Sequence, residues 1–285
     1  MEILHTASEL RDWSRNSRRL NQVDRAGCIG LVPTMGALHA GHASLIRAAA
    51  ASCDYVAVSI FVNPAQFAPE EDFARYPRTF EADCALAEAE GASVIFAPAV
   101  EELYPAGAAT FVEVSGLSNR LDGASRPGHF RGVATVVAKL LIVCEPDRAF
   151  FGRKDAAQVA VVRRMVEDLR LATEIMDCPI VREPDGLAMS SRNVYLSPAE
   201  RVHALILSRA VEKVESLASS GELRSCVLRS AARELFEEQP AVRVDYIELV
   251  DWATLEPIET AAPGSLFAVA AFVGATRLID NVILP

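Results

Sequence analysis

Two histidines, His39 and His42, end a run that begins at Pro33. The full run is Pro33-Thr34-Met35-Gly36-Ala37-Leu38-His39-Ala40-Gly41-His42, and a short apolar segment precedes it. At this spacing both imidazoles would lie on one face of a helix. A helix start offers unpaired N–H groups and a positive dipole to a phosphate, and glycines let the backbone approach a ligand closely. The run therefore predicts a site for an anion such as a phosphate.

Other interpretations of the histidine pair remain open at this point. A His-x-x-His pair can share a zinc ion, although the sequence has no H-E-x-x-H motif and no cysteine close to the pair. The two residues could also be ordinary surface or core histidines in a turn. The motifs of P-loop kinases, simple dinucleotide-binding folds and serine hydrolases are absent from the sequence.

Two later segments add charged and hydroxyl side chains. In Gly152-Arg153-Lys154-Asp155, the lysine could reach a phosphoryl oxygen and the aspartate could accept ribose hydroxyls. In Met189-Ser190-Ser191-Arg192, two hydroxyls and a guanidinium could bind a triphosphate. Taken alone, each segment could equally be a solvated loop with a helix cap.

The elements that must position these side chains follow an alternating pattern up to about residue 177. Short apolar runs predict strands at 28–32, 55–61, 93–97, 148–151 and 173–176, and the runs between them predict helices at 45–51, 79–90, 129–144 and 156–169. Such alternation indicates a parallel sheet covered on both faces. In an open parallel sheet, ligands bind beyond the carboxyl ends of the strands, where the histidine run is expected.

The composition changes after residue 177, and we predict a second domain there. The segment 182–198 is polar, and it precedes charged helices near 199–218 and 222–239. Strand-like runs at 242–250, 266–273 and 278–284 complete an expected α+β unit with an antiparallel sheet. The predicted domains are therefore 1–177 and 178–285.

The composition of the 285-residue chain excludes several classes of protein. With 51% hydrophobic and 23% charged residues, the chain is expected to fold and to bury a core. Its net charge of −10 argues against binding to nucleic acid or to an anionic membrane surface. The six cysteines are dispersed and are expected to be reduced thiols, which favours a cytoplasmic location. No signal peptide or membrane-spanning segment is predicted.

Seven ordered blocks together resemble the pantothenate synthetase (pantoate–beta-alanine ligase) family, within the HxGH nucleotidyltransferases. The blocks are the run from Pro33 to His42, Phe61-Val62-Asn63-Pro64 with Gln66-Phe67, Tyr76-Pro77-Arg78-Thr79, Arg126-Pro127-Gly128-His129-Phe130-Arg131-Gly132-Val133, Gly152 to Asp155 with Gln158, Asp185 to Asn193, and Arg277-Leu278-Ile279-Asp280-Asn281. The chain departs from the family where Arg153 replaces a usual Glu and where Ala156 and Ala157 replace bulkier or polar residues. The resemblance implies a Rossmann-like nucleotidyltransferase domain with a smaller C-terminal lid domain.

The resemblance also implies a reaction. The family activates the carboxylate of pantoate with ATP, which releases pyrophosphate, and the amine of beta-alanine then attacks the pantoyl adenylate to give pantothenate and AMP. Activation is needed because a free carboxylate would have to expel oxide, whereas an adenylate expels AMP. Such chemistry depends mostly on positioning and on cationic stabilisation of the phosphates.

By resemblance, His42 is the proton donor and acts with His39 and Lys154, while Gln66 contacts pantoate and beta-alanine and Gln158 contacts pantoate. Asn63 is a further expected substrate contact. The expected ATP contacts are Met35, Gly36, Ala37, Leu38, His39, Ala40, Gly41, His42, Gly152, Arg153, Lys154, Asp155, Val181, Met189, Ser190, Ser191 and Arg192. Magnesium is expected to enter on the ATP phosphates, with Asp83 as an indirect support, and the chain is expected to be a homodimer.

Two competing functions differ in their products. Another HxGH nucleotidyltransferase would join a nucleotide to a phosphate acceptor and would form a dinucleotide-like compound instead of AMP. A non-catalytic nucleotide-binding or zinc-binding module would bind ATP or metal without turnover.

Overall fold

A six-stranded parallel sheet forms the first part of the protein, seen in a computed structural model that describes residues 1–20, 27–69 and 71–285. The strand order is β1-β4-β3-β2-β5-β6, and all paired strands are parallel. The strands are β1 (Glu2–Leu4), β2 (Ile29–Thr34), β3 (Tyr55–Ile60), β4 (Val94–Phe96), β5 (Arg148–Gly152) and β6 (Glu174–Cys178). The predicted parallel α/β sheet is confirmed.

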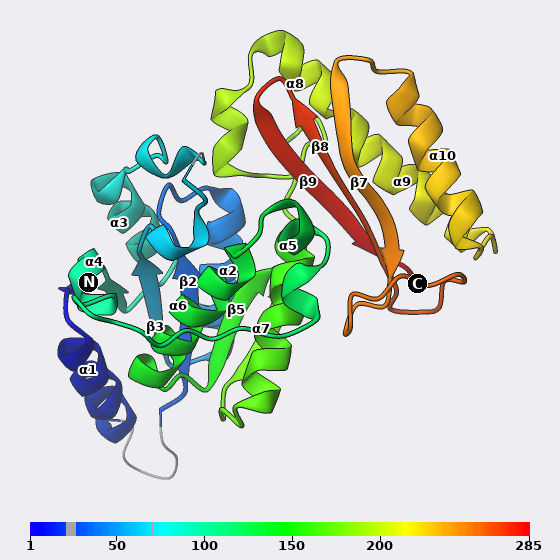
Figure 1. The fold of residues 1–285 in the computed structure, drawn as a ribbon. Coiled ribbons are helices and arrows are strands. Elements are labelled where there is room, and N and C mark those ends of the chain that lie inside the picture. Colours follow the sequence, from blue (N-terminus) through cyan, green and yellow to red (C-terminus); the bar gives the residue numbers. More distant parts are fainter. Residues whose placement is uncertain (21–26, 70) are drawn as a thin grey trace.

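Successive residues of a strand point to opposite sides of the sheet. Because the central strands are nearly continuous apolar runs, both faces of this sheet are apolar. Leu31 and Phe151 pack into one core, whereas their neighbours Val32 and Phe150 pack into the other. The first core is covered by α1 (Ala7–Leu20), α6 (His129–Cys144) and α7 (Ala156–Asp168), and the second by α2 (Ala40–Ser52) and α3 (Phe80–Ala89) (Figure 1). Because helices cover both faces of the sheet, a ligand can reach it only at the ends of the strands.

The C-terminal part is a three-stranded antiparallel sheet with helices against it. Its strands are β7 (Val242–Val250), β8 (Leu266–Val273) and β9 (Thr276–Ile283), and its helices are α8 (Pro198–Ala204), α9 (Ile206–Ser219) and α10 (Ser225–Glu237). Leu207, Leu228 and Phe267 are fully buried in its own core. This part confirms the predicted α+β unit.

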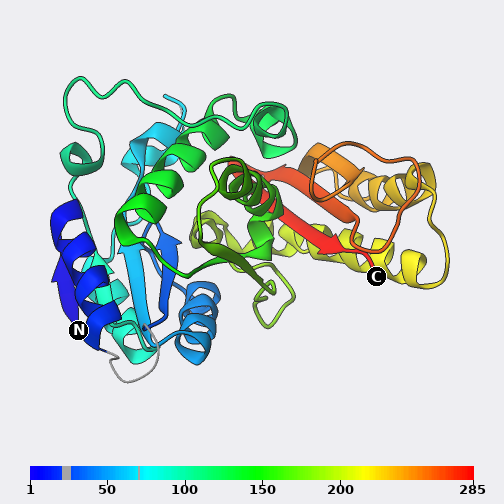
Figure 2. The ribbon, with the colours of Figure 1, turned by 90° about the horizontal axis from the view of Figure 1, so that it is seen from below.

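The two parts lie side by side (Figure 2), and the edge strand β9 lies against the first part. The strand contacts the short 3-10 turn Arg153–Asp155 that follows β5. Leu255 and Leu266 also pack against the core of the parallel sheet. The short helices α4 (Val100–Leu103) and α5 (Asp122–Ser125) lie in the connection between β4 and α6. The parallel sheet ends at Cys178, and the domain boundary between 177 and 178 stays a prediction.

Three elements differ from the sequence-based expectation. Helix α2 begins at Ala40 instead of residue 45, because the histidine run itself supplies its cap. The expected helix 199–218 is divided into α8 and α9 at Leu205. The strand β1 was not expected, because it has only three residues and depends on pairing with β4.

Two further expectations concern cysteines and membrane segments. All six cysteines are free thiols in the described structure, as predicted. Among the helices of the described residues, none has both the length and the apolar character needed to cross a membrane.

Candidate active site

A cleft of about 1360 Å³, a volume that includes the open solvent at its mouth, lies beyond the carboxyl ends of β2, β3 and β5. Of the residues expected in the site, those that line it are Met35, His39, Gly41, His42, Asn63, Gln66, Gly152, Lys154, Asp155, Gln158, Val181, Met189, Ser190, Ser191 and Arg192. The expected residues outside its lining, all of them described, are Gly36, Ala37, Leu38, Ala40, Arg153 and Asp83. Segments far apart in the sequence therefore meet in one cleft.

The two histidines cap the N-terminus of α2 through each other's backbone. The Nδ1 of His39, the N-cap residue, accepts a hydrogen bond from the N–H of Gly41 at 3.1 Å, and the Nδ1 of His42 accepts one from the N–H of His39 at 3.3 Å. Capping boxes usually pair Ser or Thr with Glu or Gln, but here both partners are imidazoles. A Cβ at position 41 would meet the His39 ring at 2.9 Å, so this arrangement requires glycine there.

This capping fixes the tautomers of both rings. Since each Nδ1 accepts a hydrogen bond, each neutral ring carries its proton on Nε2. Burial, followed by the charge of Lys154, lowers the pKa of His39 to about 4. Burial, followed by the charge of His39, lowers the pKa of His42 to about 3. At neutral pH the two rings are therefore uncharged Nε2–H donors in the cleft.

The turn that leads from β2 to the histidines is held by Asp83, whose side chain is buried. Its Oδ2 accepts from the N–H of Ala37 at 2.9 Å, and its Oδ1 accepts from the N–H of Leu38 at 2.8 Å. The Thr79 hydroxyl donates to Oδ1 at 3.0 Å. The backbone of Ala37 has a φ of 50°, which this carboxylate stabilises. Asp83 thus supports the loop. Its indirect role in magnesium binding stays a prediction.

Lys154 and Asp155 bring opposite charges to the cleft at the end of β5. The Lys154 Nζ lies 3.3 Å from the Asp155 Oδ1. Burial raises the pKa of the Asp155 carboxyl, but the charge and hydrogen bond of Lys154 outweigh this effect and the net shift is downward. The carboxylate is therefore ionised beside an ammonium group.

A pair of buried amides forms another part of the lining. The Asn63 Nδ2 donates to the Gln66 Oε1 and to the carbonyl of Gly132, both at 3.1 Å, and the Gln66 Nε2 lies 2.8 Å from the Met35 Sδ. Position 132 must be glycine, because a Cβ there would lie 2.2 Å from the carbonyl oxygen of Ala65. This close approach brings α6 and its apolar side chains to the cleft. Apolar lining residues include Phe61, Val133, Val136, Val137, Leu140 and Phe151.

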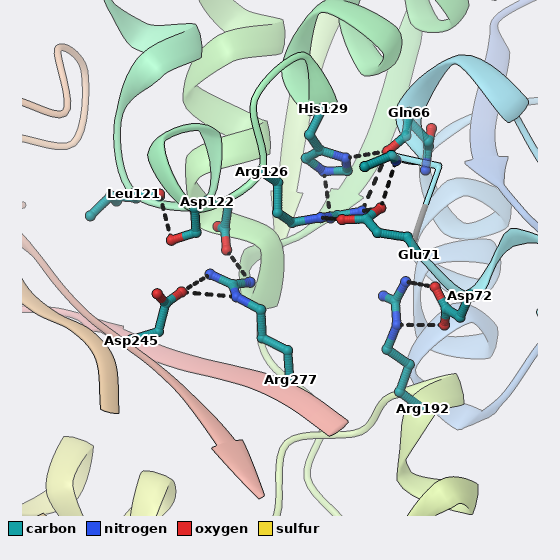
Figure 3. A network of polar contacts seen from close by, with 12 residues as sticks. Gln66, Glu71, Asp72, Leu121, Asp122, Arg126, His129, Arg192, Asp245 and Arg277 are labelled. Atoms are coloured by element: carbon teal, nitrogen blue, oxygen red, sulfur yellow. Dashed lines mark hydrogen bonds and ion pairs between the residues drawn. The ribbon is translucent and has the colours of Figure 1, made fainter. Parts of the chain in front are cut away.

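Arg192 reaches the cleft from the C-terminal side of the chain and is already paired. Its Nε and Nη2 donate to the two carboxylate oxygens of Asp72, each at 3.0 Å (Figure 3). The hydroxyls of Ser191 and Tyr76 are 3.2 Å apart. The Ser190 side chain accepts from the N–H of Arg192, so it also caps the following turn. The Nη1 edge of the guanidinium is not engaged by Asp72.

Arg126 and His129 line the cleft and were not singled out as site residues. Arg126 donates to both carboxylate oxygens of Glu71 at 2.6 and 2.7 Å and to the Nε2 of His129 at 3.0 Å (Figure 3). Since that Nε2 accepts, the His129 Nδ1–H donates to the carbonyl of Gln66 at 2.9 Å. Both residues belong to the block 126–133, which was the available signal for them.

The structure shows what surrounds the three residues that depart from the family pattern. Arg153 and Arg163 both pair with Asp177, and the Arg163 guanidinium lies 4.8 Å from the centroid of the Trp252 ring. The arginine at 153 is thus balanced by a carboxylate on β6. Ala156 and Ala157 are both buried in the core at the start of α7, where small side chains fit.

No zinc or magnesium cage is formed by the protein within the described residues, because no three His, Cys, Asp or Glu side chains come together to hold a metal ion. Both histidine Nδ1 atoms are also engaged by backbone N–H groups. The zinc interpretation of the histidine pair therefore gains no support from the structure.

Comparisons with known proteins agree along the whole chain. The sequence profile described as Pantoate-beta-alanine ligase matches residues 2–283. A pantothenate synthetase of Acidobacterium capsulatum is 59% identical over 283 residues, which are 99% of this chain and 94% of that protein.

Solved structures also match over nearly the whole chain. A pantothenate synthetase from Thermus thermophilus matches with a TM-score of 0.92 and 45% identity, covering 100% of both chains. A pantoate–beta-alanine ligase from Francisella tularensis, complexed with beta-gamma ATP and beta-alanine, matches with a TM-score of 0.79 and 32% identity over 99% of this chain and 97% of that one. The chain belongs to the pantoate–beta-alanine ligase family.

Proposed function

We propose that this protein condenses pantoate with beta-alanine at the expense of ATP, through a pantoyl adenylate, and releases pyrophosphate and AMP. The observation that carries the proposal is that one cleft joins two kinds of lining. His39, His42, Lys154 and Arg192 offer N–H donors suited to phosphate oxygens, and an adjoining pocket of amides and apolar side chains suits a small hydroxy acid. Family membership supports the same reaction.

In the first step, a carboxylate oxygen of pantoate attacks the α-phosphorus of ATP, and the bond between the α-phosphorus and the bridging oxygen to the β-phosphorus breaks. Negative charge moves to the departing pyrophosphate. The Nε2–H groups of His39 and His42 and the ammonium of Lys154 donate to the phosphate oxygens as this charge develops. His42, which the resemblance identifies as the proton donor, directs its Nε2–H to these oxygens.

Pantoate binds between the amides and the apolar wall. Gln66 and Gln158 recognise its carboxylate and hydroxyls, because amides both donate and accept without adding charge. Asn63 orients Gln66 through the 3.1 Å hydrogen bond between their amides. The two methyl groups of pantoate pack against Val133, Val136 and neighbouring residues of α6.

In the second step, the amine of beta-alanine attacks the acyl carbon of the adenylate, the bond from that carbon to the AMP oxygen breaks, and the nitrogen loses a proton. Gln66 contacts both acids. The complex of the Francisella tularensis ligase with beta-gamma ATP and beta-alanine supports the binding of ATP and beta-alanine by this protein.

The proposal also covers the ATP contacts, magnesium, the location of the enzyme and its oligomeric state. The ATP contacts come from those predicted residues that line the cleft, with Val181 beside the adenine. A magnesium ion, which usually keeps several waters and binds through substrate phosphates, enters on ATP and reduces phosphate repulsion. Asp83 acts on the phosphate site through the loop it holds. The enzyme is proposed to be a cytoplasmic homodimer in which residues 178–285 form a lid.

Product analysis tests the proposed function. The protein is incubated with ATP and magnesium, and pantoate and beta-alanine are each omitted in turn. We expect AMP and the amide in quantity only when both acids are present. A dinucleotide-like product would favour another nucleotidyltransferase, and ATP binding without any product would favour a binding module.

A further inference from the structure

The motif Arg277-Leu278-Ile279-Asp280-Asn281 on β9 has no part in the chemistry described so far. Its three polar side chains each hold a different segment. Arg277 pairs with Asp122 at 2.7 Å and with Asp245 at 2.8 Å (Figure 3), and Asp280 pairs with Arg182 at 2.6 Å. Asn281 instead contacts the turn that carries Lys154. The strand therefore ties the C-terminal part to the site at one specific place.

The contact of Asn281 is a double one. Its Nδ2 donates to the carbonyl oxygens of Arg153 and Lys154, each at 2.9 Å. A planar amide with its two N–H groups bound to successive carbonyls fixes the orientation of the two peptides that flank the Cα of Lys154. The Lys154 side chain leaves the backbone at that Cα, so the direction of its ammonium depends on this contact.

The environment of Asn281 is unusual for a residue that only stabilises the fold. The residue is 4% exposed, and its Oδ1 has no hydrogen-bond partner among the described residues. A buried acceptor without a partner costs stability. The residue thus retains a costly acceptor while both of its donors are directed at the catalytic turn.

We propose that Asn281 is a positioning residue, which holds the 153–154 backbone so that Lys154 meets the phosphates. The inference rests on the proposed function, since it assigns a task to Lys154 in adenylation. It also means that Lys154 is in place only when β9 of the C-terminal part is docked against the turn.

Trp252 provides a matched control. Its indole Nε1 donates to the carbonyl of Ala156 at 3.0 Å, which is also a contact from the C-terminal part to the segment after β5. Trp252→Phe removes this hydrogen bond but leaves the two carbonyls held by Asn281 untouched. If any contact between the two parts sufficed, both substitutions would act alike.

The test is pantoate-dependent exchange of labelled pyrophosphate into ATP, measured for Asn281→Ala in two backgrounds, wild type and Lys154→Ala. Exchange by the wild-type protein is measured first, and its absence would refute the proposed function itself. In the wild-type background we expect Asn281→Ala to lower the maximal exchange rate on the order of 10- to 100-fold, as small misplacements of reacting groups do, with little change in the KM for pantoate. In the Lys154→Ala background we expect the same substitution to change the rate by less than about twofold, because its effect passes through Lys154.

Equal slowing in both backgrounds would overturn the proposal, since a general loss of structure would act independently of Lys154. An unchanged rate in Asn281→Ala, or the same slowing in Trp252→Phe, would overturn it as well. If Asn281→Ala does not fold, Asn281→Ser replaces it in the same cycle. The serine keeps one donor, so it is expected to show a smaller slowing that also disappears in the Lys154→Ala background.

Discussion

Two parts of the cleft lining are held in different ways. The histidine turn, residues 35–42, is fixed by contacts within the first part of the chain, through the mutual capping of His39 and His42 and the carboxylate of Asp83. The serine–arginine segment, residues 189–192, follows the parallel sheet and is held by Asp72 and Tyr76, more than a hundred residues away.

This difference suggests that the two segments have different functions. Donors that are fixed by their own loop need no reorganisation when charge develops, which is how an electrostatic site accelerates a reaction. A segment held by distant side chains from another part of the chain is better suited to gripping a ligand. We therefore expect changes in the histidine turn to affect rate, and changes near Arg192 to affect ATP affinity.

The largest expected effect is on the rate of adenylate formation. His42→Ala and Lys154→Ala each remove a donor to the phosphates, and we expect single-turnover adenylation to slow by about 10²–10³-fold, with a smaller effect on ATP binding. His203→Ala is the control, because His203 lies on α8 and pairs with Gln239, just after α10, in the C-terminal part. Near-normal adenylation in either variant would remove that residue from the mechanism.

The next effect concerns pantoate. A carboxylate at position 158 would repel the carboxylate of pantoate, and like charges brought together cost several kcal/mol. We expect Gln158→Glu to raise the KM for pantoate about tenfold or more beyond the rise caused by Gln158→Ala. Equal values in the two variants, measured by initial rates at saturating ATP, would argue against a pantoate contact.

A smaller effect is expected at the serine–arginine segment. Asp72 engages the Nε and Nη2 edge of Arg192 and so orients its Nη1 edge. Asp72→Asn weakens this orientation, and we expect the KM for ATP to rise about 2- to 10-fold, the equivalent of about 0.5–1.5 kcal/mol for one hydrogen bond, with little change in kcat. Asp12→Asn, an exposed change on α1, is the control. A fall in kcat with an unchanged KM would contradict the contrast between the two regions.

The last effect is on stability at acid pH, and it does not concern catalysis. The unfolded chain protonates its histidines near pH 6.5, whereas His39 and His42 in the folded chain do so only at about 4 and 3. Protons therefore favour the unfolded state as the pH falls below 6.5, and the Tm should decrease between pH 6.5 and 4. His39→Asn retains an N-cap that does not titrate, so its Tm should decrease less over this range. An equal decrease in both proteins would show that His39 is not protonated on unfolding.

Much of the fold could be predicted because its signals are local. The apolar run 129–144 gave the bounds of α6 correctly, and the strand runs 55–61 and 148–151 were close to β3 and β5. Strand β1 could not be recognised, because three residues carry no periodicity and only the pairing with β4 makes them a strand. The break at Leu205 likewise has no proline or glycine to indicate it.

Motifs predicted the site residues, many of which line one cleft, but the motifs did not predict the partners of these residues. Nothing in the sequence places the carboxylate of Asp83 on the N–H groups of Ala37 and Leu38, more than forty positions earlier. The same holds for Asn281 and the carbonyls after β5. Such contacts depend on how α3 and β9 pack, which is tertiary information.

Isotope exchange tests the central claim, the pantoyl adenylate, most directly. The protein is incubated with ATP, magnesium, labelled pyrophosphate and pantoate, without beta-alanine. We expect label to enter ATP only when pantoate is present, because the adenylate forms reversibly before the amine arrives. If no label enters ATP with pantoate, while pantothenate still forms after beta-alanine is added, the adenylate route is contradicted.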